Sequence, residues 1–209
     1  MKTDDLIATL ARDVAPVRPL VSPAIRLAGW LSVAFAGAAA GIWVFGARPD
    51  AVDLLQRPDS LVTAILAVGT TTFAAAAALV LAIPGAERSP VLRAAAMTLV
   101  TVWAIVLVGA AARSGVGVAG DVHWPICFVR VVAIGFLPAL VLVVMIRRAL
   151  PLRLSWTSGL TATAAMGIAA GAIQFICPID NPAHALLGHF APIVVLGAIA
   201  AWVAPRLSK

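Results

Sequence analysis

The chain has few charged residues and few residues that can take part in chemistry. Only 11% of its 209 residues are charged, whereas soluble domains usually carry about 25%. It holds two cysteines, three histidines and nine acidic residues. Because apolar runs fill nearly all of the chain, no soluble catalytic domain has room to fold. The sequence therefore predicts an integral membrane protein that is not an enzyme.

The apolar runs predict six transmembrane helices. Each run is about 20 residues long, which at about 1.5 Å per residue crosses about 30 Å of hydrocarbon. The runs cover Leu27–Phe45, Leu61–Ile83, Ala94–Ala112, Ile126–Ile146, Trp156–Ile176 and Leu186–Ala204. We therefore expect an all-α polytopic membrane bundle over residues 25–209, preceded by a short tail over residues 1–24.

Three further absences narrow the class of protein. The second and third runs hold no ionisable side chain, and such side chains are the usual mark of proton-coupled transport. No basic cluster is interleaved with aromatic residues, so direct binding to nucleic acid is not indicated. The opening residues carry acids before any apolar run and lack a small-residue cleavage site. We therefore expect the tail to be retained and not removed as a signal peptide.

Lysine and arginine are distributed unequally between the two sides of the predicted bundle. Eleven of the fifteen lie in the tail, the second and fourth loops and the C-terminal residues, and four lie in or beside the first and third loops. Cytoplasmic loops of membrane proteins are enriched in these residues. Both termini are therefore predicted to be cytoplasmic, with the odd-numbered loops outside.

Glycines four residues apart predict close packing of helices. Gly37 and Gly41 lie on one face of the first run, and Gly167 and Gly171 on one face of the fifth. Such pairs let a neighbouring helix approach closely. We expect this packing within the bundle, with a homodimer interface as the alternative, and the sequence leaves the oligomeric state open.

The two cysteines are expected to meet at the outer face. Cys127 begins the fourth run and Cys177 ends the fifth, so two antiparallel helices return both thiols to nearly the same depth. A stabilising disulfide, two inert thiols and a reactive pair are all compatible with this spacing. The absence of a C-x-x-C motif argues against a disulfide-exchange enzyme. Arg130 and the start of a helix favour a thiolate at Cys127, whereas a helix C-terminus disfavours one at Cys177.

Polar residues near the second cysteine allow a metal site instead. Asn181 or Asp180 can cap the last helix, with Pro182 in its first turn. His189 follows His184 by five residues, about 140° around an α-helix, so the two imidazoles are not expected to share a face. Besides the thiols of Cys127 and Cys177, the accessory ligands for a soft or borderline cation would be Asp180, His184, His123 and His189.

The tail carries a short amphipathic pattern. Leu6, Ile7, Leu10 and Val14 fall on one face of a helix that should end before Pro16. About three helical turns are marginal alone in water, so this segment needs a surface on which to fold. A partner's groove and the lipid headgroups are both candidates. The early acidic residues favour a protein partner, because helices on membrane surfaces are usually basic.

The chain as a whole resembles a known family. The features that carry the resemblance are the opening MKTDDLIATLARDVAPVRPL, the six runs behind an N-terminal tail, the segment CFVRVVAIGFLPALVLVVMIRRALP and the CPID that begins fifty positions after the first cysteine. In this order and spacing they resemble the NrsF-like membrane anti-sigma factors over nearly the whole chain.

The resemblance implies a function. Such proteins hold an extracytoplasmic-function sigma factor at the bacterial inner membrane through the cytoplasmic N-terminal segment, and release it when outer-face cysteines report heavy-metal or oxidative stress. Carried over by position, Cys127 and Cys177 are the sensing pair, acting through a disulfide or a transient heavy-metal cation, with no resident cofactor required. The sigma-binding residues would be Leu6, Ile7, Leu10, Val14, Arg18 and Leu20. The alternative is a small membrane protein that handles or transports metal through the Cys/Asp/His cluster.

Overall fold

The computed structural model describes residues 3–12, 20–85, 90–114, 123–149 and 151–207, and all the regular structure in these ranges is helical. The long helices are α2 (Pro23–Phe45), α3 (Pro58–Leu81), α4 (Val91–Ser114), α5 (Trp124–Arg147), α6 (Leu154–Ile173) and α8 (Ala191–Leu207). The short elements are α1 (Thr3–Arg12), the 3-10 turn η1 (Asp53–Gln56), α7 (Pro182–His184) and the π-helix η3 (Ala185–Phe190). The predicted all-α fold is confirmed.

Five helices are long and apolar enough to cross a membrane. They are α2, α3, α4, α5 and the continuous α7–η3–α8 unit, Pro182–Leu207. Each has at least 23 residues, which at about 1.5 Å per residue exceeds the hydrocarbon thickness of a bilayer. These helices correspond to five of the six runs expected from the sequence, and the remaining run corresponds to α6.

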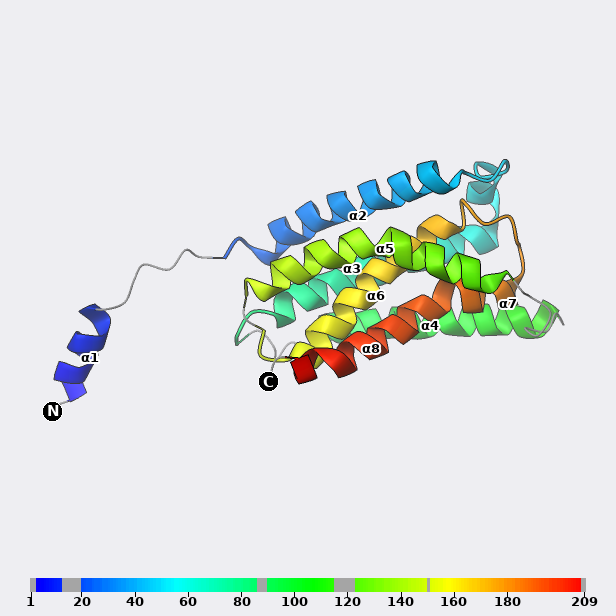
Figure 1. Cartoon of the computed structure of the whole chain (residues 1–209). Coiled ribbons are helices and arrows are strands. Elements are labelled where there is room, and N and C mark those ends of the chain that lie inside the picture. Colours follow the sequence, from blue (N-terminus) through cyan, green and yellow to red (C-terminus); the bar gives the residue numbers. More distant parts are fainter. Residues whose placement is uncertain (1–2, 13–19, 86–89, 115–122, 150, 208–209) are drawn as a thin grey trace.

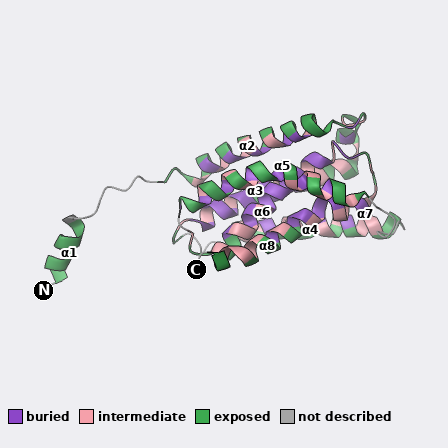
Figure 2. Ribbon diagram, in the orientation of Figure 1, coloured by how far each residue is buried: buried purple, intermediate pink, exposed green. Residues whose placement is uncertain are grey.

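Helix α6 lies in the middle of the bundle, against α3, α5 and α8 (Figures 1 and 2). Thirteen of its 20 residues are buried. Its composition is accordingly rich in small and hydroxyl residues, because a helix that is shielded from lipid has no need for large apolar side chains. Thr157 and Thr161 are buried, and their hydroxyls donate to the carbonyls of Arg153 and Thr157 at 3.1 and 2.6 Å.

The surrounding helices expose large apolar side chains on their outward faces (Figure 2). Among those more than 60% exposed are Trp43, Ile65, Ile105, Val129 and Phe136. Apolar surface of this extent is unusual on a soluble monomer and is typical of a lipid-facing belt. Together with a mean hydropathy of +1.05, it makes the bundle a membrane-type fold.

The two glycine pairs pack within the bundle, as predicted. A Cβ at Gly41 would lie 2.6 Å from the Ile134 side chain of α5, and one at Gly171 would lie 2.9 Å from Cβ of Ala67 in α3. Gly167 similarly faces Thr71, and Gly37 faces Pro138. The glycines therefore bring α2 against α5 and α6 against α3.

Helix α1 stands apart from the bundle in Figure 1. Every side chain described in it, over residues 3–11, is exposed. The helix is described over Thr3–Arg12, and Pro16, before which it is expected to stop, lies outside the described residues. Leu20 is also exposed, whereas Val14 and Arg18 lie outside the described residues.

Three segments far apart in the sequence gather at one end of the bundle, the right-hand end in Figure 1. They are the α2–α3 connection, the start of α5 and the α6–α7 connection. Below we refer to this end as the cysteine end and to the opposite end as the terminal end. The cysteine end carries all of the candidate metal and redox residues.

Candidate functional site

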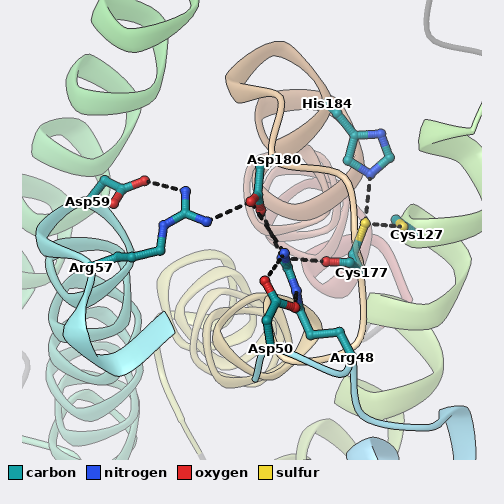
Figure 3. Close-up of polar contacts among 8 residues, drawn as sticks. All are labelled: Arg48, Asp50, Arg57, Asp59, Cys127, Cys177, Asp180 and His184. Atoms are coloured by element: carbon teal, nitrogen blue, oxygen red, sulfur yellow. Dashed lines mark hydrogen bonds and ion pairs between the residues drawn. The ribbon is translucent and has the colours of Figure 1, made fainter. Parts of the chain in front are cut away.

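The structure brings the two cysteines together at the cysteine end. The sulfur of Cys127, in the first turn of α5, lies 3.5 Å from that of Cys177, which follows α6 (Figure 3). Both cysteines are buried, and both are free thiols. A disulfide would require an S–S distance of about 2.05 Å. The pair is close enough for one small movement to join the sulfurs.

Two histidines complete a compact group around the thiols. Nε2 of His184 lies 3.3 Å from the sulfur of Cys177, and the rings of His184 and His189 meet edge to face with centroids 5.2 Å apart. One ligand atom from each of the four residues lies within 4.8 Å of all the others. All four residues are buried. We call Cys127, Cys177, His184 and His189 the Cys–His tetrad.

The placement of His189 corrects the sequence reasoning. That reasoning assumed an α-helix, in which residues five apart do not share a face. The structure instead forms the π-helix η3 after His184, and the N–H of Ala191 bonds to the carbonyl of Leu186, five residues back. A π-turn places residue i+5 about one turn above residue i. His184 and His189 therefore face each other.

Pro192 gives a physical reason for the π-turn. It has no N–H to donate to the carbonyl of Gly188, and its ring would clash with that carbonyl in a regular α-helix. A wider turn before the proline relieves this clash, and single π-turns of this kind often occur at functional sites.

Gly188 allows the start of α5 to approach the histidines. A Cβ at this position would lie 3.1 Å from Cβ of Cys127 and 3.2 Å from the carbonyl oxygen of Trp124. It would also lie 3.5 Å from Nε2 of His184. Any side chain larger than hydrogen would therefore push α5 away from η3.

Helix α7 begins at the polar turn that the sequence indicated. The side chain of Asn181 accepts a hydrogen bond of 2.9 Å from the N–H of Ala183, and Pro182 is the first helical residue. Of the two candidate caps, Asn181 is therefore the N-cap. The carboxylate of Asp180 is left available for another role.

Asp180 lies in an ion-pair network, which we call the arginine clamp (Figure 3). Its carboxylate accepts hydrogen bonds of 2.8 and 3.3 Å from the buried guanidinium of Arg48 and one of 2.6 Å from Arg57. Arg48 also pairs with Asp50 at 2.6 Å, and Arg57 with Asp59 at 3.2 Å. The clamp joins the α2–α3 connection to the α6–α7 connection.

Arg48 also holds the backbone around Cys177. Its guanidinium donates to the carbonyl of Cys177 at 3.0 Å, and its own N–H donates to the carbonyl of Phe175 at 2.9 Å. The sequence reasoning counted Arg48 and Arg57 only as topology signals. Asp180, which joins the two arginines, is more than a hundred residues away along the chain, so no local pattern indicated the clamp.

The clamp and the thiol pair change the acidity of two groups. Hydrogen bonds from Arg48, and then from Arg57, lower the pKa of Asp180 to about 2 in spite of partial burial. The pKa of the Cys177 thiol is also lowered, chiefly by its hydrogen bond with Cys127 and further by His189, against the opposing effect of burial. For Cys127, the thiolate expected from the helix start and Arg130 stays a prediction. Arg130, on which that expectation partly depended, stacks over the ring of Phe45 at 5.5 Å.

The predicted accessory ligands therefore fall into two groups. His184 and His189 join the thiols in the tetrad. Asp180 is bound in the arginine clamp, and His123 is an exposed residue at the start of α5. Among the described residues, neither of these two contributes to the compact group of ligand atoms.

The fold and the site define a class: an all-helical membrane-type protein that buries two thiols and two imidazoles at one end. The chain belongs to the NrsF family, described as negative regulator of sigma F, whose family profile matches residues 10–209. The resemblance stated from the sequence is thereby confirmed, and the family implies a regulatory role, negative control of a sigma factor, and not a catalytic one. The match begins at Leu10, so Leu6 and Ile7 precede it. No curated protein and no solved structure matches the chain.

Proposed function

We propose that this protein is an inner-membrane anti-sigma factor that holds an extracytoplasmic-function sigma factor and releases it when the cysteines sense metal or oxidant. The observation that carries the proposal is the family match across residues 10–209. The site adds a reason for the sensing step, because two buried thiols 3.5 Å apart are one small movement from a disulfide.

The proposed topology has six spans, with both termini in the cytoplasm and the tetrad outside. Of the ten arginines in residues 20–207 that the structure describes, six lie at the terminal end and four at the cysteine end. This bias agrees with the positive-inside rule. Helix α6 follows α5 at the terminal end and leads to Cys177 at the cysteine end, so it serves as the additional span.

The proposed sigma-binding element is the exposed apolar face of α1 with the residues that follow it. Leu6, Ile7 and Leu10 are 41, 58 and 60% exposed. Burying each in a groove on the partner would contribute about 1.5–3 kcal/mol. The proposed element also includes the exposed Leu20 and, by sequence, Val14 and Arg18.

A capture experiment tests the tail. Full-length protein in detergent is incubated with the co-encoded sigma factor, and Leu6→Asp/Leu10→Asp is compared with Ala8→Asp, which places a single aspartate on the opposite face of α1. The double variant should lose at least about tenfold in affinity, about 1.4 kcal/mol, while Ala8→Asp should bind normally. Undiminished capture by the double variant would exclude this face.

The sensing step is a change at the tetrad that weakens sigma binding. In the oxidative branch, hydrogen peroxide takes two electrons from the thiols, which form the S–S bond, and their two protons leave in the two water molecules produced. The sulfurs must then close from 3.5 Å to about 2.05 Å, which draws α5 toward the α6–α7 connection. A tenfold loss of sigma affinity requires about 1.4 kcal/mol of coupling between these states.

Replacing the cysteines tests the sensor. Cys127→Ser, Cys177→Ser and the double variant are compared in cells by transcription of the sigma-dependent genes, with and without cadmium or chromate. If the reduced pair is not needed for sigma binding, each variant should still repress the sigma-dependent genes but should no longer induce them. If the reduced pair is needed, basal transcription of these genes should rise. Unchanged basal and induced transcription in all three would reject the sensing role.

The alternative is a small metal-handling or transport protein, and the tetrad is the observation that favours it. That alternative predicts altered cellular metal content in the same cysteine variants. The anti-sigma proposal predicts altered transcription at constant metal content.

A further inference from the structure

We propose that Cys127, Cys177, His184 and His189 form a closed, four-coordinate site for a divalent cation with a filled d shell, such as Zn²⁺ or Cd²⁺. The physiological role of this site rests on the proposed sensing function, because the cation would be the ligand that the sensor detects. The binding itself is a property of the tetrad and is measured without a sigma factor.

The distances fit tetrahedral coordination. Bonds of about 2.3 Å to sulfur and about 2.0–2.1 Å to nitrogen at tetrahedral angles place two sulfurs about 3.8 Å apart and a sulfur and a nitrogen about 3.5 Å apart. The structure has 3.5 Å between the two sulfurs and 3.3 Å between Cys177 and Nε2 of His184. The two thiols and Nε2 of His184 therefore need to move apart by only a few tenths of an ångström, and the ligand atom of His189, which lies within 4.8 Å of the other three, completes the site.

The ligand set selects the class of cation. Thiolate and imidazole favour soft or borderline metals, whereas Mg²⁺ and Ca²⁺ require oxygen ligands. Two thiolates neutralise a divalent cation, so the occupied site carries no net charge. This matters because all four residues are buried, where an uncompensated charge is costly. A monovalent cation would leave one negative charge in the same place.

His189 supplies an independent reason to expect a ligand. Its Nε2 atom is buried and makes no hydrogen bond within the described part of the chain. An unsatisfied buried polar atom costs about 1–3 kcal/mol, and native structures rarely keep one without a functional reason. Binding of a cation by the tetrad compensates for that cost.

The surroundings hold the ligands in place. Cys127 lies on α5, the histidines lie on α7 and η3, and the connection that bears Cys177 is fixed by Arg48 through two backbone carbonyls. Groups of this kind around a metal site commonly affect affinity by about 10–100-fold. The arginine clamp therefore organises the site without donating a ligand to it.

A cavity of about 380 Å³ gives the ion a route to the buried tetrad. Cys177 and His189 line it, as do Arg57, Asp59 and Asp180. The side chains of these last three are 40, 71 and 43% exposed, so they form its outer rim. Both carboxylates are paired with arginines of the clamp, so the rim gives the ion a path to the thiolates without drawing it there by charge.

Metal titration of the full-length protein in detergent, reduced and stripped of metal, tests the proposal. Co²⁺ serves as a spectroscopic probe and Cd²⁺ as the second ion. We expect one ion per chain, a thiolate-to-metal charge-transfer band, and visible Co²⁺ bands of tetrahedral intensity. His189→Gln should lower Co²⁺ affinity at least about tenfold, and Cys177→Ser by more. His123→Gln is the matched control, because this histidine at the same end lies outside the tetrad.

The proposal is overturned if wild-type protein binds no stoichiometric ion, if the Co²⁺ spectrum is that of an octahedral site, or if His189→Gln binds as wild type does. A second measurement needs no variant: bound Cd²⁺ should protect both cysteines of the wild-type protein from alkylation, and unchanged alkylation would contradict the site. Because neither experiment contains a sigma factor, a failure of the anti-sigma proposal leaves these results interpretable.

Discussion

At the scale of single residues, the site depends on small side chains and distant charges. The hydrogen at Gly188 lets α5 approach the histidines, and the guanidinium of Arg48 fixes the loop that bears Cys177. The approach of Cys127 to Cys177 was predictable from the sequence, because helix length sets the depth of each thiol. The arginine clamp was not, because its partners come together only after the bundle has formed.

Gly188→Ala should distort the tetrad. The added methyl group would lie 3.1 Å from Cβ of Cys127 and 3.2 Å from a backbone carbonyl, which should cost about 1–3 kcal/mol of stability and weaken Cd²⁺ binding. Thermal unfolding in detergent and metal titration measure the two effects. Gly29→Ala is the control, because nothing lies within 4 Å of a Cβ there and alanine favours the helix by up to about 1 kcal/mol. Equal behaviour of the two variants would contradict the packing at Gly188.

Asp180→Asn should loosen the arginine clamp and alter its pH dependence. The pKa of Asp180 is lowered to about 2 from its usual value near 4, so its ion pairs stabilise the folded state above about pH 4 and are lost as the pH falls toward 2. At neutral pH the loss should be about 1 kcal/mol, because the carboxylate is partly exposed.

Unfolding temperatures of Asp180→Asn at pH 7 and below pH 3 measure both effects. The wild-type advantage should be present at pH 7 and disappear in acid. Asp53→Asn provides the control, since Asp53 is an exposed carboxylate in the α2–α3 connection, at the same end of the bundle, and has no ion pair among the described contacts. A stability difference between wild type and Asp180→Asn that does not depend on pH would contradict the assigned role.

At the scale of elements, the π-helix η3 decides which side chains meet. Hydrophobic pattern and helix length were sufficient to predict the spans, because both depend on local sequence. They were not sufficient for η3, because the patterns were read with α-helical periodicity and a π-turn shifts every later side chain by one position. The sequence does contain one indication of η3, namely Pro192 four residues after Gly188. The proline shows that one helical hydrogen bond is missing, but it does not show how the chain compensates for that loss.

Pro192→Ala should therefore weaken the metal site without unfolding the bundle. An alanine N–H can bond to the carbonyl of Gly188, which favours a regular α-helix and turns His189 away from His184. We expect Co²⁺ affinity to fall at least about tenfold, with little change in the helical circular dichroism. Pro205→Ala, in the last turn of the same helix, should bind Co²⁺ normally. Wild-type affinity in Pro192→Ala would show that the π-turn does not depend on the proline.

At the scale of the whole molecule, exposure to lipid and burial within the bundle explain which features of each span the sequence could predict. The exposed faces of α2, α3, α4 and α5 carry many large apolar side chains, so each was recognisable as a span. Helix α6 is not among the five described helices that are apolar enough to cross a membrane, and its neighbours cover it. The sequence predicted its length but not its central position, since position in a bundle depends on contacts between helices and not on hydropathy.

Reporter fusions test the six-span topology. Alkaline phosphatase joined after Ile179 should be active, and the same enzyme joined after Leu152 or at the C-terminus should be inactive, because only the first site lies outside. These fusion sites bracket α6. Equal activity after Leu152 and Ile179 would show that α6 does not cross the membrane.

The central claim is that occupation of the Cys–His tetrad lowers the affinity of the protein for its sigma factor. The most direct measurement is the dissociation constant between the co-encoded sigma factor and the full-length protein in nanodiscs, with and without saturating Cd²⁺, for wild type and for Cys127→Ser/Cys177→Ser. The account predicts at least about a tenfold weaker complex with Cd²⁺ for the wild type, about 1.4 kcal/mol, and no change for the double variant. An unchanged dissociation constant in wild-type protein that has bound one Cd²⁺ per chain would contradict it.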